Sequence, residues 1–321
     1  MLFGKSKQAY YKHDSRRGLR VVAMEEFIVE FVKSVRDRDP GIGGVKLWYM
    51  YRREFPPEAR VGRDRFMSAL RVSGLGLRSR PRRPRTTDSS HGLPVYPNLV
   101  KEFVPSSPNS LWVSDITYIP YWGSGNDYSF CYLSLVLDAY TEEIIGWSVG
   151  PTLETRYPLE ALRMALRRIS GRRVDLIHHS DRGCQYASRE YTGALSDRGI
   201  RISMTGSGDP KENAQAERVN GTLKNELLHG MRFRCVEDVR RAVSQAVSFY
   251  NLERPHMSID MMTPAQAASC RGEIRKRWRS FRLEALKRMQ EPLNVPENAL
   301  PLRDVKMTQY WTLLDDNQKQ I

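Results

Sequence analysis

HHSDRGCQYASREYTGALSDRGIRISMTGSGDPKENAQAERVNGTLK, residues 178–224, is the stretch that decides the fold. It begins at the end of an apolar run, VDLIHHS, which is typical of a buried strand and stops just before Asp181. A helix over SREYTGALSDRG, a short strand IRISMT and a long helix from near Glu212 follow. Because α/β sheets present ligands at the carboxyl ends of their strands, Asp181 is a candidate site residue.

The long helix has two separate faces. Residues at helical spacing form an apolar face, which is expected to pack on a sheet: Ala216, Val219, Leu223 and Leu227. A second, polar face has spacings of four, three and four: Asn213, Glu217, Asn220 and Lys224. We therefore expect Glu217 to point into a cleft while the apolar face holds the sheet.

Upstream, the sequence predicts three strands in LWVSDITYIP, DYSFCYLSLVLDAY and EEIIGWSVG, joined as an antiparallel meander. An amphipathic helix over 158–170 separates them from the strand before Asp181. The order β-β-β-α-β-α-β-α predicts an α/β fold with a mixed five-stranded sheet flanked by helices. Asp115 lies inside the first strand, where acids are disfavoured, and is the third candidate acid. Further helices are expected over 236–254 and 273–290, the second of them basic.

The N-terminal region reads as a small all-α domain. Helices are expected over 24–37, 44–54 and roughly 63–73, each ended by proline or glycine. Three short helices with tight connections suggest a helix-turn-helix that binds DNA, and a small helical bundle without a DNA role is the alternative. An arginine- and proline-rich strap follows, which could track a phosphate backbone or be a solvated linker. Its arginines are Arg78, Arg80, Arg82, Arg83 and Arg85.

The charge of the chain is unevenly distributed. The net charge of +14 comes from residues 1–105 (22 Lys/Arg against 11 Asp/Glu) and 271–321 (11 against 7), while 106–270 is nearly neutral (18 against 19). Basic arms around a neutral centre favour a polyanion partner, because Lys and Arg that neutralise phosphates release counterions. Solubility alone is the alternative explanation.

Composition excludes several other classes of protein. No stretch approaches the roughly 20 apolar residues of a membrane span, and the N-terminus lacks a signal core, so a cytoplasmic protein is expected. The four cysteines form no CxxC, and the six histidines no HxxxH, which argues against a zinc site or a disulfide framework. Reduced and mostly buried thiols are expected instead.

Three carboxylates from different elements suit a hard divalent cation such as magnesium. Two such ions about 4 Å apart can activate an attacking oxygen and stabilise a leaving oxygen in a phosphodiester. Each acid alone is weak evidence, since a strand aspartate is more often a turn residue and a helix glutamate is usually solvated. From the residues alone, the site at Asp115, Asp181 and Glu217 is one of several possibilities.

Asp181 and Glu217 are separated by 35 residues, and Lys224 follows Glu217 by seven. With the strand order above, this pattern resembles the DDE recombinases, which have an RNase H-like core. Five separated words are similar to one branch, the OrfB transposases of the insertion-sequence-three family: WVSDITYI, LVLDAYTEEIIGWSVG, HHSDRGCQYAS, ENAQAERVNGTLKNE and YNLERPHMSIDMMTPAQA. The resemblance runs from about residue 20 to 270.

The resemblance implies that Asp115, Asp181 and Glu217 bind Mg²⁺ or Mn²⁺, with two ions per site, and are catalytic. It implies that Lys224 contacts DNA near the cleaved end and that Asn213 supports the helix of Glu217. Arg182 and Gln185 would orient Asp181 or touch DNA. Other positions are expected to be structural: Asp138, His178, His179, Arg254 and His256. Many members have Asp at Glu212 and Ser at Cys184, and neither difference removes an acid.

The implied activity is cleavage of the 3′ end of a mobile DNA element followed by attack of the freed 3′-hydroxyl on target DNA. The implied partners are DNA, other copies of the chain, and an upstream OrfA-type DNA-binding protein or fusion. The start of the chain is consistent with the second reading frame alone. Retroviral integrases are a poorer match, because the chain lacks an N-terminal His/Cys zinc module. The alternatives are an RNase H-like nuclease that does not join strands, and an idle DNA-binding derivative.

Five regions follow from these observations. Residues 1–20 are a basic arm, 21–75 the helix-turn-helix-like region, 76–105 the linker, 106–270 the catalytic core, and 271–321 a basic helix and tail.

Overall fold

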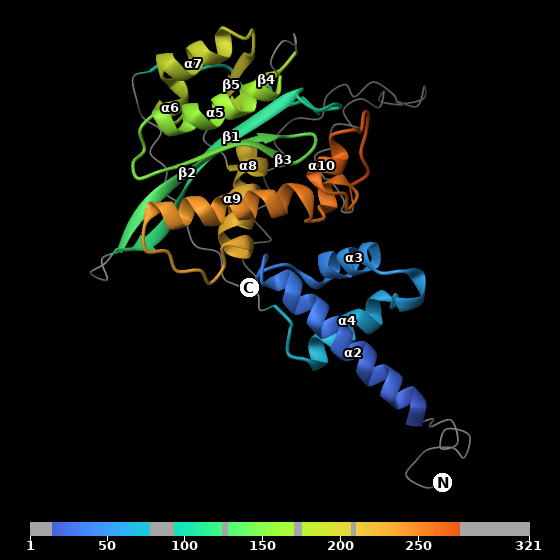
Figure 1. Ribbon diagram of the computed structural model, residues 1–321. Helices are drawn as coiled ribbons and strands as arrows, with labels where there is room; N and C mark the ends of the chain where they lie inside the picture. Colours follow the sequence, from blue (N-terminus) through green and yellow to red (C-terminus); the bar gives the residue numbers. More distant parts are fainter. Residues whose placement is uncertain (1–14, 78–92, 124–127, 170–174, 207–209, 277–321) are drawn as a thin grey trace, which may run out of the picture. The chain divides into compact units, whose positions relative to one another are not determined.

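The computed structural model describes residues 15–77, 93–123, 128–169, 175–206 and 210–276 (Figure 1). The arginines of the predicted strap, Arg78 to Arg85, lie outside these ranges, as does the chain from residue 277. Residues 273–276, the start of the expected basic helix, are not helical. No helix in the described ranges is long and apolar enough to cross a membrane.

One mixed five-stranded sheet forms the centre of the chain, in the order β3-β2-β1-β4-β5. β1 (Leu111–Trp122), β2 (Tyr128–Asp138) and β3 (Glu143–Gly150) form the antiparallel meander. β4 (Ile177–Ser180) pairs in parallel with β1, and β5 (Arg201–Met204) pairs in parallel with β4. The predicted α/β class and the mixed sheet of an RNase H-like core are therefore confirmed.

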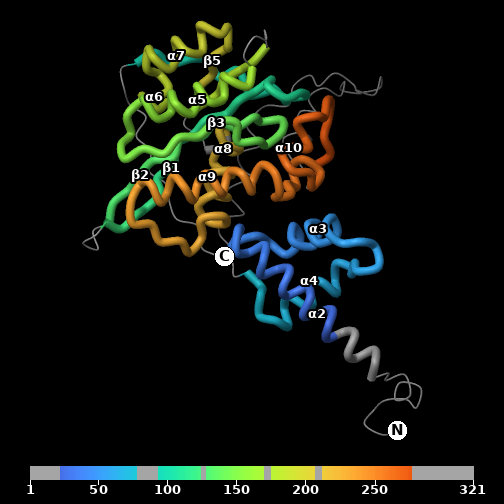
Figure 2. The backbone as a smooth tube through the Cα atoms, in the orientation of Figure 1, coloured from blue at the N-terminus to red at the C-terminus, as the bar shows by residue number. Residues whose placement is uncertain are grey.

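Helices cover both faces of the sheet, as Figures 1 and 2 show. On one face, α5 (Arg156–Arg168), α6 (Cys184–Ala187) and α7 (Arg189–Ser196) enclose an apolar cluster that includes Trp112, Leu162 and Tyr191. On the other face, α8 (Ala214–Thr222) and α9 (Val236–Leu252) pack with α10 (Pro264–Ala267) behind α9. Successive strand residues point to opposite faces of the sheet, and both faces are buried over its inner part.

The long helix predicted from near Glu212 is built from three segments. A 3₁₀ turn, Pro210–Asn213, leads into α8, and α8 continues into a π-helical turn over Leu223–Leu227. All four residues of the predicted apolar face, Ala216, Val219, Leu223 and Leu227, are buried. The face was therefore predicted correctly, although the π-turn, which often marks functional sites in helices, was not expected.

Three helices precede the sheet: α2 (Ser15–Arg36), α3 (Gly44–Glu54) and α4 (Arg63–Val72), with a 3₁₀ turn at Pro57–Ala59. They match the three expected helices, except that α2 begins nine residues before Met24. Residues 15–20, which were expected to belong to a loose arm, are therefore helical. Arginine is a good helix former, so a basic composition does not stop a helix. The DNA-binding role of these helices stays a prediction.

The helices α2–α4 and the sheet belong to the same compact unit, and a buried ion cluster joins them. Arg254 donates to both carboxylate oxygens of Glu226, at 2.9 and 2.8 Å, and lies 3.7 Å from Asp39. Lys46 of α3 donates to Glu226 at 3.2 Å. Arg254 also contacts His256, so both residues are structural, as expected. We call Asp39, Lys46, Glu226 and Arg254 the junction cluster.

A backbone contact reinforces the junction cluster. The Gly41 N–H donates to the carbonyl oxygen of Glu226 at 3.0 Å. A Cβ added at Gly41 would lie 2.5 Å from the Glu226 Cα, so only glycine permits this approach. The loop between α2 and α3 therefore rests directly on the π-turn that continues α8.

The cysteines are free, as expected, and no disulfide involves them. Cys131 is buried, but Cys184 and Cys235 are exposed. The expectation of mostly buried thiols was wrong, because Cys184 and Cys235 lie at the starts of helices α6 and α9 rather than within strands.

Candidate active site

The parallel register of β1 and β4 relates the two aspartates. Leu111, Trp112 and Val113 pair with Ile177, His178 and His179, an offset of 66 residues in each case. The same offset relates Asp115 to Asp181, two positions beyond the last pair. Asp181 follows the last residue of β4 and accepts a hydrogen bond from the Gly183 N–H at 3.0 Å. Both aspartates therefore lie where the carboxyl end of β4 meets β1.

The polar face of α8 lies against the same part of β1. Asn213 donates through Nδ2 to the Ser114 carbonyl oxygen at 3.0 Å, a bond between the start of the helix and β1. One turn past Glu217, Asn220 Nδ2 donates to Asp115 Oδ2 at 2.8 Å. Glu217 is four residues after Asn213 and three before Asn220, so it shares their side of the helix. The spacing of the polar face therefore predicts that Glu217 points toward Asp115.

Lys224, the last residue of that face, lies in the π-turn. Its ammonium is 3.9 Å from the centre of the Tyr118 ring, three residues beyond Asp115 on β1. Burial lowers the pKa of Lys224, and the negative charge of Asp115 opposes this shift. The Lys224 ammonium therefore lies beside β1, and the charge of Asp115 acts on it.

Tyr186 of α6 is a buried residue five positions after Asp181. Burial raises the pKa of its phenol well above the ordinary value, and the charges on Tyr191, Asp115 and Asp181 raise it further.

Several buried polar atoms around the acids have no hydrogen-bond partner within the protein: Asn213 Oδ1, Asn220 Oδ1 and Tyr186 Oη. Buried polar atoms are rarely left without a partner, so these atoms are suited to water molecules or to a hydrated ion. In the described part of the chain, no three His, Cys, Asp or Glu side chains are close enough to enclose an ion. The structure therefore brings the two aspartates to the carboxyl end of β4, and no closed ion cage forms among the described residues.

The histidines that precede Asp181 hold the end of the strand. His179 bonds through Nδ1 to the Ser203 hydroxyl at 2.8 Å and through Nε2 to the Glu212 carbonyl oxygen at 3.2 Å. His178 Nε2 is 2.8 Å from the Ser114 hydroxyl and 3.0 Å from that of Tyr191. Burial, followed by the charge of His179, lowers the pKa of His178 to about 3. Both rings brace β4 against its neighbours, as expected.

The supporting residues that the sequence suggested contact backbone. Arg182 donates to the carbonyl oxygens of Thr205 and Gly206, which joins the turn after β4 to the turn after β5. Gln185 donates to the Leu153 carbonyl oxygen at 3.0 Å. Asp138 accepts from the N–H groups of Tyr140, Thr141 and Asn109, so it is the strand-end turn residue that was predicted.

Two contributions to the site were missed by the sequence reasoning. Tyr186 lies in the word HHSDRGCQYAS, but nothing in that word indicates that its phenol is buried and that the charges of both aspartates raise its pKa. Asn220 was assigned to the polar face without a partner. Its spacing of three from Glu217 was the available signal. An amide on the same helix face as a proposed metal ligand can donate to the carboxylate of Asp115 on the neighbouring strand.

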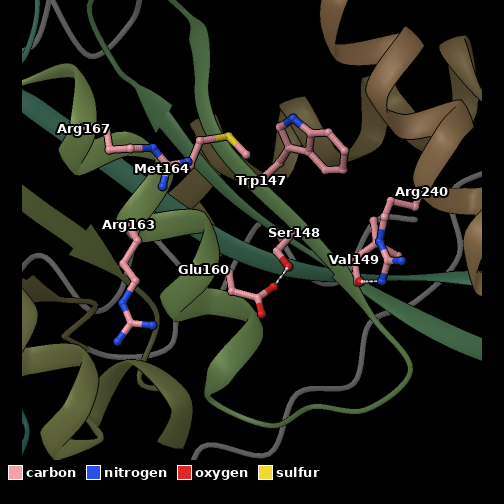
Figure 3. A pocket seen from close by; sticks show the side chains of 8 residues that line it. All are labelled: Trp147, Ser148, Val149, Glu160, Arg163, Met164, Arg167 and Arg240. Atoms are coloured by element: carbon pink, nitrogen blue, oxygen red, sulfur yellow. Dashed lines mark hydrogen bonds between the residues drawn. The ribbon is translucent and has the colours of Figure 1, made fainter.

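A pocket of about 340 Å³ lies away from the acids, between β3, α5 and α9 (Figure 3). Arg163 and Arg167 of α5 and Arg240 of α9 are among the residues that line it, and Ser148 donates to Glu160 inside it at 2.7 Å. None of the predicted site residues lines this pocket.

The chain matches two models described as an integrase core domain, over residues 105–210 and 198–264. It is 33% identical over 264 residues to a protein of Mycobacterium tuberculosis named "Putative transposase for insertion sequence element IS986/IS6110", covering 80% of this chain and 92% of that protein. It is 31% identical to the transposase for insertion sequence element IS629 of Shigella sonnei, covering 79% and 83%. It is 34% identical to the transposase InsF for insertion sequence IS3A of Escherichia coli, covering 62% and 68%.

Solved structures with a similar chain path include a simian T-cell lymphotropic virus intasome in complex with a PP2A regulatory subunit, at a TM-score of 0.43 and 17% identity over 73% of this chain and 74% of that chain. The catalytic domain of the Mos1 mariner transposase gives a TM-score of 0.37 at 15% identity, over 44% and 70%.

Proposed function

The chain belongs to the transposases of the insertion-sequence-three family, which carry an integrase core domain, and from this we propose a specific chemistry for its sheet edge. In this proposal Asp115, Asp181 and Glu217 are the catalytic acids that bind divalent metal. They would cut the 3′ end of the element and then join it to target DNA. Two observations support the proposal. Asp115 and Asp181 are related by the parallel register of β1 and β4, and Glu217 belongs to the face of α8 whose Asn220 bonds Asp115.

The residues present fit a hydrated Mg²⁺ or Mn²⁺ pair. All three proposed ligands offer carboxylate oxygens, which hard cations prefer, and these cations keep several water molecules. The buried acceptor atoms Asn213 Oδ1 and Asn220 Oδ1 are suited to receive hydrogen bonds from such waters. When bound, the ions would lower the pKa of the attacking hydroxyl group or water and offset the negative charge of the phosphodiester.

The side chains around the acids would keep them in place. Asn220 fixes one oxygen of Asp115, and the Gly183 N–H fixes one oxygen of Asp181. Because preorganised charges do not need to rearrange during the reaction, these bonds lower the cost of reaching the transition state. Lys224 would hold a DNA phosphate beside Asp115.

The two steps balance without an external energy source. In the first step, a water oxygen bonds to phosphorus at the element end, the bond from phosphorus to the 3′ oxygen breaks, and a 3′-hydroxyl is released. In the second step, that 3′ oxygen bonds to a target phosphorus, and the target's own 3′ oxygen leaves with a proton. The first step is hydrolysis and consumes one water molecule, and the second step makes one phosphodiester for the one it breaks, so no nucleotide cofactor is consumed.

The proposed partners follow from charge. The excess of Lys and Arg in residues 1–105 would bind the phosphates of the element end and target, with Arg78, Arg80, Arg82, Arg83 and Arg85 as contacts. We also propose that several copies assemble on the DNA and that an upstream OrfA-type protein, or a fusion to it, shares recognition of the ends.

The test is incubation of the full chain with a labelled element end, target DNA and Mg²⁺, with and without the upstream partner. Wild type is expected to produce a cleaved 3′ end and a joined product, whereas Asp181→Asn makes neither and binds DNA as before. Glu190→Gln, an exposed acid on α7, is the matched control and keeps activity. Wild-type cleavage by Asp181→Asn refutes the site.

A substrate with a pre-cut element end distinguishes a transposase from a nuclease that does not join strands. A nuclease of the same fold would cut the uncleaved substrate but leave a pre-cut 3′-hydroxyl unjoined. Joined product from the pre-cut end supports transposition over hydrolysis alone.

A further inference from the structure

The outer half of the β1–β2 hairpin has an aromatic face. Tyr118 pairs with Tyr132, Pro120 with Phe130, and Trp122 with Tyr128. Residues directly opposite each other in an antiparallel pair point to the same side of the sheet, so all six share one face. The residues between them, such as Ile119, Cys131 and Leu133, point to the other side and are buried in the core.

This aromatic face is open to solvent, although the same side of the inner hairpin is covered. Nearer the other end of β1 and β2, Trp112 and Val136 are buried against α5. Figure 1 shows β1 and β2 extending past α5. Tyr118 is 54% exposed and Tyr128 is 58% exposed. The other four residues of this face are partly buried, so Tyr118 and Tyr128 are the two rings that it exposes.

The rings contact each other edge to face along the hairpin. The centroid of Tyr118 is 5.1 Å from that of Phe130, Phe130 is 4.8 Å from Tyr128, and Tyr128 is 5.8 Å from Trp122. These packed rings have few rotamers to lose when a flat ligand binds, which lowers the entropic cost of stacking. We call Tyr118, Trp122, Tyr128 and Phe130 the hairpin patch.

Two cations flank the hairpin patch. Lys224 lies 3.9 Å from the ring centre of Tyr118, and the guanidinium carbon of Arg232 lies 5.2 Å from the ring of Trp122. The Trp122 N–H donates to the carbonyl oxygen of Phe233 at 2.8 Å, which holds the segment that carries Arg232 against β1. Alternating rings and cations are typical of surfaces that bind single-stranded nucleic acid, where bases stack and phosphates pair with the cations.

The hairpin patch begins close to the proposed active site. Tyr118 is three residues after Asp115 on the same strand, which is roughly 10 Å at about 3.3 Å per residue, and its side chain points to the opposite side of the sheet from Asp115. Lys224, which follows α8 on the Asp115 side, has its ammonium against the Tyr118 ring and so links the two sides. A strand whose scissile phosphate lay at Asp115 would reach the hairpin patch by passing Lys224.

We propose, on the basis of the proposed function, that the hairpin patch is a stacking site for unpaired DNA bases beside the scissile phosphate. Lys224 and Arg232 hold the phosphates of these nucleotides. The bound strand must be unpaired, because the flat faces of bases inside a duplex are already covered by their neighbours. The site therefore favours an element end whose terminal bases are open.

The test compares two DNAs that differ only in pairing. One is a blunt duplex, and the other carries a short single-stranded 3′ overhang. Affinities are measured by fluorescence anisotropy with the full chain and without divalent metal, so that catalysis plays no part. Wild type is expected to bind the overhang more tightly than the blunt end.

Tyr118→Ala and Tyr128→Ala should each weaken overhang binding by about 5- to 150-fold, the range for one stacked base, and leave blunt-duplex binding unchanged. Tyr118→Trp and Tyr128→Trp should keep the preference, because a larger ring still stacks. Leu252→Ala, which truncates a 60% exposed apolar side chain on α9, is the control and should bind both DNAs like wild type.

The outcomes are distinguishable. Equal weakening on both DNAs, or none on either, overturns the inference. A change from dimer to monomer in sedimentation, without a change in overhang affinity, also overturns it and assigns the hairpin patch to contact between copies. If wild type cuts and joins DNA while the tyrosine variants keep the full preference for the overhang, the stacking inference is wrong and the proposed function stands. If wild type binds neither DNA, both the inference and the proposed function are wrong.

Discussion

Removal of the Arg254 side chain is a severe test of how the junction cluster holds the chain together. Arg254 is 4% exposed, donates twice to Glu226 and faces Asp39, which is fully buried. Replacing it with methionine keeps similar apolar volume but leaves two buried carboxylates without their main counter-charge. Removing one partner of a buried ion pair costs about 3–5 kcal/mol, and we expect Arg254→Met to lower the free energy of unfolding by that amount at pH 8.

The loss should depend on pH in a definite direction. In the wild type, burial raises the pKa of Asp39 to about 7, helped by the charge of Glu226 and opposed by Arg254 and Lys46. The pKa of Glu226 is lowered, because Arg254 and Lys46 outweigh its burial. Without Arg254, both folded-state pKa values rise. A raised carboxylate pKa destabilises the fold above the ordinary pKa near 4, so the cost grows with pH and falls again under acid conditions.

The assay is urea unfolding followed by far-UV circular dichroism at pH 8 and pH 5.5. The control is Arg168→Met, because Arg168 also makes two bonds to one carboxylate, Glu143, at 2.6 and 3.0 Å, but is 45% exposed. An exposed pair of this kind contributes less than about 1 kcal/mol. Equal losses for the two variants, or a loss for Arg254→Met that does not change with pH, would refute the reasoning.

Three further predictions concern other contacts. His178 has a folded-state pKa of about 3, below its ordinary value, so its contribution to stability is present above pH 6.5 and is lost toward pH 3. Urea unfolding should show that wild type loses about 2 kcal/mol more than His178→Gln between pH 7 and pH 5, and parallel pH profiles would contradict this. Gly41→Ala should lower the free energy of unfolding by about 1–3 kcal/mol, because its Cβ meets the Glu226 backbone. The control is Gly43→Ala, whose Cβ meets nothing within 4 Å and should leave the free energy of unfolding unchanged. Equal free energies of unfolding for the two variants would argue against close packing at Gly41. Asn220→Ala should reduce the cleavage rate by about 10- to 100-fold with little change in DNA affinity, since it frees Asp115; an unchanged rate in single-turnover assays would exclude this role.

Much of the sheet and one helix could be predicted because their periodicity is local. The strands alternate over short runs, and the apolar face of Ala216, Val219, Leu223 and Leu227 is readable from spacing alone. The π-turn over Leu223–Leu227 could not be predicted, because Glu226 within it makes a tertiary contact with the loop at Gly41. The local sequence around residue 224 does not indicate that residue 41 packs there.

The site was predictable as a set of residues but not as an arrangement. The spacing of Asp181 and Glu217 within one stretch indicated a pair, whereas Asp115 joins them only through the parallel pairing of β1 with β4. That pairing follows from the crossover through β2, β3 and α5, which no local pattern encodes. The pairing of Arg254 with Glu226 has the same origin, because each is an ordinary charged residue until the fold buries it.

The most direct test of the proposed ion site is a titration of the full chain with Mn²⁺, with the free ion followed by electron paramagnetic resonance. If Asp115, Asp181 and Glu217 together hold the ions, then Asp115→Asn, Asp181→Asn and Glu217→Gln should each bind Mn²⁺ more weakly than wild type. Glu190→Gln should bind it unchanged. Wild-type Mn²⁺ binding by all three acid variants would contradict the account, because the carboxylates at the sheet edge would then not be the ligands.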